Sequence, residues 1–369
     1  MNIAQAYLKP EEKAVFLLRS LYRSFGYLPY KMSKFEEYDL YMRHKEFLKS
    51  DRIITFNDAD GKLMALKPDV TLSIVKNGEN QPGGKQKVCY NENVYRVSPS
   101  THQFREILQT GLECIGDVDL YDLYEVLDLA VKSLAMLSED FILSVSHVGI
   151  LTGLFEAWQV PGKAQAGLVK CISEKNIHEM GPICDEFGLS DRAREGMMLL
   201  PALDGELLPT LKALENHLEG EMAKAAWDEL YALANLFRGS EYENKIRLNL
   251  SLVDDMKYYN GLVFKGYLAG IWESVLSGGR YDTLPQHMGR KAGAVGFAVY
   301  MDLLENLPGR ERESDVDVLL LYPQGAEPAV VAGKVRELQA EGKTVSAQKI
   351  IPEKLRYKTL CCLEGEEKA

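Results

Sequence analysis

Two glycines precede three polar residues in the stretch LSGGRYDTL. Gly278 and Gly279 would let the backbone come close to a ligand, because glycine has no Cβ atom. Arg280, Tyr281 and Asp282 would then place a cation, a hydroxyl and a carboxylate beside it. These residues could hold a small polar ligand. On their own they fit a hairpin that ends in a Gly-Gly turn equally well.

A second polar set alternates along QFREILQTGLECIG, residues 103–116, and the period of two predicts a strand. Residues i and i+2 of a strand share a face, so Gln109, Gly111 and Glu113 point together, away from their apolar neighbours. A sheet face with an amide, a carboxylate and a gap between them could receive a cationic or donor-rich ligand. A solvent-exposed polar face is the alternative.

A third polar residue, Asp69, stands just before a helix that the pattern predicts to begin at Thr71. An aspartate in this position typically caps the helix by accepting a backbone N–H, and we favour that interpretation. Its carboxylate could instead bind the amine of a ligand.

The composition describes a globular chain of more than one unit. At 369 residues the chain exceeds the roughly 100–200 residues of a usual domain. No apolar run approaches the roughly 20 residues of a membrane span, and the N-terminus does not resemble a signal peptide, so we expect a cytoplasmic protein without a membrane partner. The six cysteines lack CxxC spacing, which predicts neither a metal site nor a disulfide framework. A net charge of −11 argues against a broad grip on nucleic acid.

The residue periodicities predict an antiparallel sheet backed by helices. The predicted helices are Lys9–Phe25, a helix from Thr71, Asp122–Met136, and one that follows a strand within residues 141–158. The predicted strands are a hairpin around Asp60–Gly61, Gln86–Pro99, residues 103–116, two antiparallel strands in Leu252–Gly270 joined at Tyr259–Gly261, and Trp272–Leu276. The segment Gly26–Tyr41 is predicted to be extended, because Pro29 is incompatible with a helix interior.

Changes of pattern along the chain predict its domains. Strand signals vanish between residues 161 and 244, which predicts a helical insertion into a core formed by residues 1–160 and 245–308. A charged linker, PGRERESD, then leads to a small α/β appendage at residues 314–369, with two strands, one helix and a short tail.

Six segments in this order resemble one known family. LKPDVT, VYRVSP, FREILQTGLECIG, LVDDMKYYNG, SGGRYD and AVGFAVYMDLL are similar to the catalytic core of histidyl-tRNA synthetases. The resemblance covers roughly residues 5–305, with the helical insertion in the corresponding place. It implies an α+β fold of the class II aminoacyl-tRNA synthetase type, in which helices flank an antiparallel sheet.

The chain departs from these synthetases where they act on ATP. Asp254 stands at the position of an arginine that is essential for activating the amino acid, and Leu303 at that of an arginine that clamps ATP. Tyr300 replaces a small glycine and Ser98 an acidic residue, whereas Arg105 is kept. A carboxylate facing an α-phosphate would repel the charge that catalysis must stabilise. The resemblance therefore implies no catalytic residue and no cofactor.

The amino-acid pocket of the synthetases, by contrast, is kept. The resemblance implies that histidine is bound by Asp69 (a glutamate in the synthetases), Thr71, Arg96, Gln109, Glu113, Tyr259 and Tyr281. Arg96 suits an α-carboxylate, and Glu113 with Tyr259 could satisfy the two imidazole nitrogens. A Glu113 carboxylate buried in this pocket would then need an incoming donor, because an unpaired buried charge is costly.

A chain that keeps the amino-acid pocket but has lost the residues that act on ATP resembles the regulatory subunits of short-form ATP phosphoribosyltransferases, which are synthetase paralogues. In that family the subunit binds histidine, forms a hetero-octamer with a separate catalytic subunit and controls the first step of histidine biosynthesis. The implied partners are the short-form catalytic subunit, L-histidine and a second copy of the chain, which would contact Gly26–Tyr41 and the strand beyond it. A working histidyl-tRNA synthetase, and a paralogue serving another partner or amine-bearing ligand, are the alternatives.

Overall fold

The computed structural model describes residues 10–48, 52–78, 83–98, 101–253, 256, 258–306 and 314–363. The chain divides into two compact units, Met1–Leu307 and Pro308–Ala369. The first unit is built on a nine-stranded sheet, and the second on a sheet of three strands.

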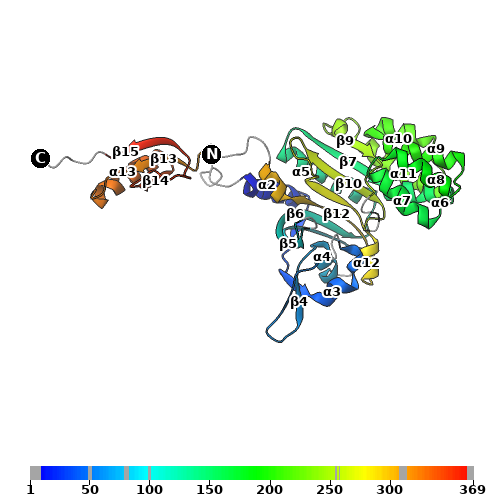
Figure 1. The fold of residues 1–369 in the computed structure, drawn as a ribbon, viewed down its shortest axis with the longest axis horizontal. Helices are drawn as coiled ribbons and strands as arrows, with labels where there is room; N and C mark the ends of the chain where they lie inside the picture. The colour runs from blue at the N-terminus through cyan, green and yellow to red at the C-terminus, as the bar shows by residue number, and fades with distance from the viewer. Residues whose placement is uncertain are drawn as a thin grey trace. The chain divides into compact units, whose positions relative to one another are not determined.

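Nine strands form the main sheet, seen at the centre of the first unit in Figure 1. In spatial order they are β1 (Leu28–Pro29), β5 (Lys85–Val97), β6 (Phe104–Gly116), β12 (Gly293–Tyr300), β11 (Leu276–Arg280), β10 (Leu262–Leu268), β7 (Phe141–His147), β9 (Ile246–Asn249) and β8 (Asp204–Glu206). Neighbours run antiparallel except β1 with β5 and β7 with β9. Segments distant in sequence therefore meet at the centre, where β12 lies between β6 and β11.

Helices α2 (Pro10–Ser24) and α5 (Leu120–Leu137) bury their apolar sides in the core of this unit. Asp119 and Asp122 form a capping box that satisfies backbone N–H groups at the start of α5. The remaining larger helices cluster at one end of the sheet (Figure 1): α6 (Val148–Ala157), α7 (Gly162–Ser173), α8 (Ile177–Glu186), α9 (Asp191–Leu199), α10 (Leu207–Glu215) and α11 (Glu221–Phe237). The predicted boundaries of a helical insertion stay a prediction.

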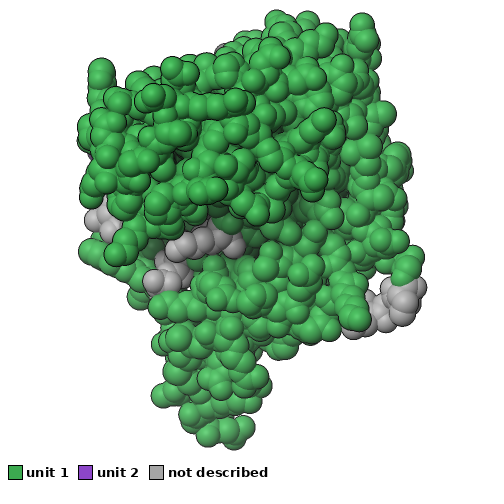
Figure 2. Space-filling model, turned by 90° about the vertical axis from the view of Figure 1, so that its right-hand side faces the viewer, with its two compact units in different colours: residues 1–307 green, residues 308–369 purple. Residues whose placement is uncertain are grey.

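A small three-stranded sheet projects from the body of the first unit, as Figures 1 and 2 show. Its strands are β2 (Phe35–Glu37), β4 (Leu63–Leu66) and β3 (Thr55–Asn57), and the predicted Asp60–Gly61 hairpin joins the last two. Its buried side shares a core with α3 (Tyr38–Arg43), α4 (Thr71–Asn77), α12 (Thr283–His287) and the 3₁₀ helix Lys45–Phe47. Further 3₁₀ turns are Leu200–Ala202, Glu243–Lys245 and Met301–Asn306.

The second unit has β13 (Val316–Leu321) between β14 (Val345–Gln348) and β15 (Tyr357–Cys362). All three strands are parallel, and α13 (Pro328–Ala340) joins β13 to β14. The segment that we expected to be a short tail thus contributes a strand.

The pair of strands predicted within Leu252–Gly270 is wrong in its first half. The described residues before Asn260 form turns and loop, and only β10 is a strand. The side chain of Asn249 explains this difference, because its Oδ1 accepts the N–H of Ser251 at 3.0 Å and ends β9 in a tight turn.

The strand predicted at Trp272–Leu276 begins later, since β11 starts at Leu276 and Trp272 is fully exposed in the preceding loop. Gly278 and Gly279 consequently lie inside a central strand, and the alternative of a Gly-Gly turn is wrong. Gly279 instead leaves room for a residue of the chain itself, because a Cβ on it would lie 2.7 Å from Cδ1 of Tyr259; the approach to a ligand stays a prediction.

Two other local predictions are also wrong. The extended segment Gly26–Tyr41 ends in helix α3, whose first turn contains Asp39 and whose last turn contains Arg43, as the helix dipole favours. The predicted all-helical region contains β8, which pairs with β9 at the edge of the main sheet.

Replacement of Gly296 by alanine should lower the free energy of unfolding by about 1–3 kcal/mol, the usual cost of overpacking. A Cβ there would collide with Glu113 Oε2 and with the carbonyl oxygen of Leu112 in the adjacent strand. Gly162→Ala is the control, since a Cβ at that position meets nothing within 4 Å. Chemical denaturation measures both, and equal stability of the two variants would contradict the crowding argument.

Candidate functional site

A cavity opens over the centre of the main sheet, and all seven residues predicted to bind histidine line it. The complete lining is Asp69, Thr71, Tyr90, Arg96, Gln109, Glu113, Tyr258, Tyr259, Ser277, Tyr281, Gly296, Phe297, Ala298 and Tyr300. The structure thus brings the predicted residues together, while the binding of histidine stays a prediction.

Strand β6 provides the floor of the cavity, with Gln109 and Glu113 on one face as expected. Their side chains are only 4% and 2% exposed, so the alternative of a solvent-exposed polar face is wrong. Gly111 lies between them, and a Cβ on it would come 2.6 Å from the hydroxyl of Tyr90. The space left by the missing side chain of Gly111 therefore accommodates the ring of Tyr90 from β5.

Two hydroxyl groups of the chain hold the Glu113 carboxyl group. Thr71 Oγ1 donates to its Oε1 at 2.9 Å, and Tyr281 Oη donates to its Oε2 at 2.5 Å. Burial raises the pKa of Glu113 to about 8, because desolvation outweighs these two hydrogen bonds and the charge of Asp69 adds to it. The expectation that this carboxylate needs an incoming donor is therefore wrong: its donors are internal, and the group is largely neutral at pH 7.

Asp69 acts as the helix cap that its position predicts, since its Oδ1 accepts the N–H of Leu72 at 2.9 Å. It also lines the cavity, so capping and ligand binding do not exclude each other. On the neighbouring strand, Arg96 Nε donates to the carbonyl oxygen of Pro68 at 3.0 Å. This bond holds the guanidinium group of Arg96 beside the Asp69 loop.

Tyrosines that the sequence did not single out as ligands complete the wall. Tyr258 belongs to the motif that supplied Tyr259, and Tyr90 pairs with Gly111 in the sheet. Burial raises the pKa of both hydroxyls well above the ordinary value, so both stay protonated. The glycine of the β6 motif could have indicated Tyr90, because a missing side chain at the centre of a sheet implies a large neighbour.

Arg280 and Asp282 point away from the cavity, contrary to the expectation that they stand beside the ligand with Tyr281. Arg280 is the last residue of β11 and faces the opposite way to its neighbour Tyr281, and Asp282 already has helical dihedral angles at the start of α12. They line an open groove together with Lys85, Lys87 and other residues.

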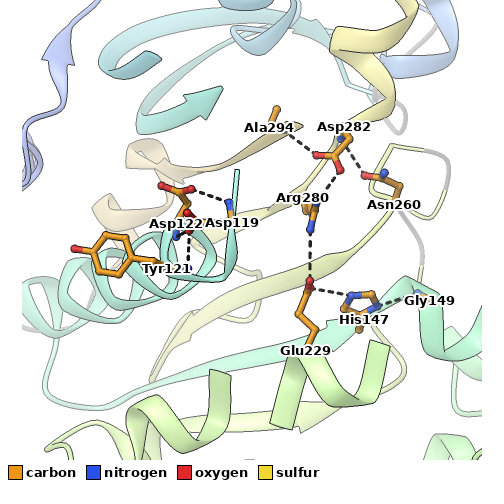
Figure 3. A network of polar contacts seen from close by, with 10 residues as sticks. All are labelled: Asp119, Tyr121, Asp122, His147, Gly149, Glu229, Asn260, Arg280, Asp282 and Ala294. Atoms are coloured by element: carbon orange, nitrogen blue, oxygen red, sulfur yellow. Dashed lines mark hydrogen bonds and ion pairs between the residues drawn. The ribbon is translucent and has the colours of Figure 1, made fainter. Parts of the chain in front are cut away.

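A chain of polar contacts runs through Arg280, as Figure 3 shows. Arg280 Nε donates to Asp282 Oδ2 at 2.8 Å, and its Nη1 lies 3.4 Å from Glu229 Oε2 on α11. The other Glu229 oxygen is 3.1 Å from His147 Nε2. Burial acts to raise the pKa of Glu229, but the contacts with His147 and Arg280 outweigh it, so the pKa lies below the usual value.

The positions that contact ATP in the synthetases are occupied differently in this chain. Asp254 lies outside the described residues. Leu303 is half-buried in the 3₁₀ turn Met301–Asn306 and packs against the core. Arg105 Nη2 forms an ion pair with Asp302 Oδ2 at 3.1 Å. Tyr300 stands at the end of β12 and fills part of the cavity wall.

Among the described residues, no group of three or more His, Cys, Asp or Glu is arranged to hold a metal ion. None of the helices described is both long and apolar enough to cross a membrane.

Glu113→Gln should change how stability depends on pH. The folded-state pKa of about 8 lies above the ordinary 4.5, so the folded protein holds this proton more tightly than the unfolded chain does. The resulting stability is fully present below pH 4.5 and is lost as the pH rises through 8, by at most about 1.4 kcal/mol per pH unit. A glutamine at this position stays neutral at every pH, so the variant does not lose stability in this way.

Denaturation between pH 4.5 and 8 therefore should show the variant gaining stability relative to the wild type as the pH rises. Glu186→Gln, at an exposed glutamate, is the control and should follow the wild type. Parallel curves for wild type and Glu113→Gln would mean that Glu113 is ionised throughout this range.

Comparison with known proteins supports the predicted resemblance. An ATP phosphoribosyltransferase regulatory subunit from Oceanobacillus iheyensis is 28% identical over 335 residues, covering 89% of this chain and 82% of that protein. A protein of the same name from Moorella thermoacetica is 28% identical over 349 residues, covering 92% and 89%.

Solved structures confirm the predicted class II synthetase-like α+β fold. An ATP phosphoribosyltransferase regulatory subunit/histidyl-tRNA synthetase from Bacillus halodurans C superposes with a TM-score of 0.77 at 24% identity, covering 96% of this chain and 94% of that chain. An ATP phosphoribosyl transferase (HisG:HisZ) complex from Thermotoga maritima gives a TM-score of 0.63 at 20% identity, covering 78% and 96%. The model of the histidyl-tRNA synthetase family matches residues 5–304. The chain therefore belongs to the histidyl-tRNA synthetase family.

Proposed function

We propose that this protein is the non-catalytic, cytoplasmic regulatory subunit of a short-form ATP phosphoribosyltransferase. It is needed for the activity of the catalytic subunit and for feedback inhibition by histidine. One observation carries the proposal: a complete amino-acid pocket persists beside altered nucleotide positions. The names of the curated relatives and the composition of the Thermotoga maritima complex support it.

The pocket offers complementary groups to each part of histidine. Arg96 suits the α-carboxylate because its planar fork matches two oxygens, and Asp69 suits the α-ammonium. Glu113 and Tyr259 suit the imidazole, whose two nitrogens need one donor and one acceptor in the neutral state. Because Glu113 is largely protonated in the empty pocket, an imidazole nitrogen is able to take its proton and form a charged pair.

The cavity is small in this conformation. Its volume is about 40 Å³, whereas an engineered apolar cavity of about 150 Å³ holds a benzene molecule. Histidine is larger than benzene, so its binding has to move side chains of the lining. A ligand that enlarges its pocket shifts the protein between two conformations, which is what a regulator requires.

The altered nucleotide positions argue against a working synthetase. An ATP phosphate approaching Arg105 would compete with Asp302, whose carboxylate already pairs with this guanidinium group. Tyr300 takes up part of the cavity wall, and Leu303 offers no charge. We expect no ATP–pyrophosphate exchange by the purified protein, and robust exchange would favour the synthetase.

The projecting sheet is the proposed surface for self-association. Phe35, Phe56, Met64 and Leu66 share one face, because Phe35 pairs with Leu66 and Phe56 with Met64. Phe35 and Phe56 are 48% and 38% exposed and meet edge to face at 5.7 Å. Ala65, on the opposite face, is fully buried in the core. An outward face with two aromatic rings is typical of an interface anchor.

Reconstitution with a short-form catalytic subunit tests the function. We expect phosphoribosyl transfer only when both proteins are present, and inhibition of that complex by histidine. In the complex, Glu113→Ala should weaken inhibition by about 30- to 150-fold, the cost of losing a charge-assisted hydrogen bond of about 2–3 kcal/mol. Glu341→Ala, at an exposed glutamate of the second unit, should change nothing. Unaltered inhibition of the Glu113→Ala complex would place the regulatory site elsewhere.

Sedimentation velocity at micromolar concentration tests the dimer. Phe35→Asp buries a charge in the proposed interface and should convert the dimer into a monomer. Leu236→Asp changes an equally exposed apolar residue on α11 and should leave the dimer intact. A monomeric wild-type protein, or a dimeric Phe35→Asp variant, would rule out this interface.

A further inference from the structure

Glu229 joins a helix to the strand that carries a pocket residue. It lies on α11, and its Oε2 is 3.4 Å from Nη1 of Arg280 at the end of β11 (Figure 3). The two side chains are 24% and 26% exposed, so water screens this pair only in part. Tyr281, the next residue, donates its hydroxyl hydrogen to Glu113.

The second oxygen of Glu229 is held by His147. The Nδ1 atom of His147 accepts the N–H of Gly149 at 3.0 Å, at the start of α6. The Nε2 atom therefore carries the proton and donates it to Glu229 Oε1 at 3.1 Å. Glu229 thus contacts the end of β7 and the end of β11 at the same time.

The backbone around Tyr281 depends on Arg280 and Asp282. Arg280 Nε holds Asp282 Oδ2, and Asp282 Oδ1 accepts the N–H of Ala294 at 2.9 Å. The N–H of Asp282 donates to Asn260 Oδ1 at 2.9 Å. Tyr281 has its own N–H bonded to the carbonyl oxygen of Ala294 at 2.8 Å. Both neighbours of Tyr281 are consequently fixed by side chains, and one of these side chains is tied to α11.

Helix α11 is itself tightly fixed to α6. A Cβ on Gly153 of α6 would collide with the backbone nitrogen of Ala223 in the first turn of α11. The two helices are therefore closely packed. The Glu229–Arg280 contact connects this pair to the residue that precedes Tyr281.

We propose that Glu229 is a positioning residue for the pocket, which holds Arg280 so that Tyr281 reaches Glu113 and thereby couples helix α11 to ligand binding. The inference rests on the proposed function in taking histidine as the ligand. When histidine enlarges the small cavity, the Tyr281–Glu113 bond has to rearrange, and α11 receives the change through Glu229. The conformational change then extends from the pocket to α11 and α6.

Glu229→Gln in the full chain tests the coupling. The amide keeps the size of the side chain and removes the charge that holds Arg280. Asp228→Asn is the matched control, because Asp228 is the preceding residue on the same helix and is exposed. Arg280→Lys is a second variant with its charge kept, since a single ammonium group cannot hold Glu229 and Asp282 in Arg280's geometry.

Two measurements apply to each variant: calorimetric titration with L-histidine, and hydrogen–deuterium exchange of peptides covering residues 276–284, α11 and β6. In the wild type and in Asp228→Asn, histidine should slow exchange in β6 and in α11. In Glu229→Gln we expect histidine affinity to fall by about 5-fold or more, within the usual range of coupling between sites. Exchange at residues 276–284 should be faster even without histidine, and the effect of histidine on α11 should disappear while that on β6 remains.

The outcomes separate the inference from the function. If wild type binds histidine and both Glu229→Gln and Arg280→Lys match it in affinity and exchange, the coupling is refuted and the proposed function stands. If the wild type binds no histidine, the proposed ligand is wrong, and exchange at residues 276–284 alone decides whether Glu229 positions Tyr281. Exchange there that is unchanged in both variants would overturn the inference in that case too.

Discussion

The burial of the Glu113 carboxyl group at the centre of the nine-stranded sheet is the constraint on which the site depends. Desolvation favours its neutral form, and two hydroxyl groups from separate elements compensate for the lost water. Room for the carboxyl group exists only because Gly296 has no Cβ on the adjacent strand. One polar group thus determines residue choice on α4, on β12 and beyond the end of β11.

The sequence predicted the parts of the site that follow from strand periodicity. Gln109 and Glu113 share a face because they lie four residues apart on an uninterrupted strand, and the structure places both in the cavity. Helix-start chemistry predicted Asp69 as the cap of the helix from Thr71, and the hydrogen bond from Leu72 bears this out, whereas both residues entered the predicted pocket through family resemblance. Arg96, Tyr259 and Tyr281 were assigned through family resemblance, since nothing in their local spacing distinguishes pocket residues from ordinary strand and loop residues.

The features of the site that the sequence did not predict depend on contacts between segments that are distant in the sequence. Arg280 looked like a ligand-binding residue because it adjoins Tyr281, yet strand alternation turns it toward Glu229, a residue of a helix about fifty positions earlier. No local sequence pattern predicts such a distant partner. The directions of Arg280 and Asp282 required the position of β11 between β10 and β12, and the same holds for the burial of Gly278 and Gly279 inside a strand.

A regulator and an enzyme make different demands on one pocket. Catalysis needs groups that stabilise charge on a nucleotide, whereas regulation needs only a ligand that binds two conformations with unequal affinity. In this chain the pocket is small, its central carboxyl group is largely neutral, and Tyr281, just beyond the end of β11, donates a hydrogen bond to it. The proposed binding of histidine would enlarge the cavity and change the hydrogen bonds of that carboxyl group together. Each change favours the enlarged conformation only when the ligand is present, so the loss of nucleotide contacts removes nothing that this form of regulation uses.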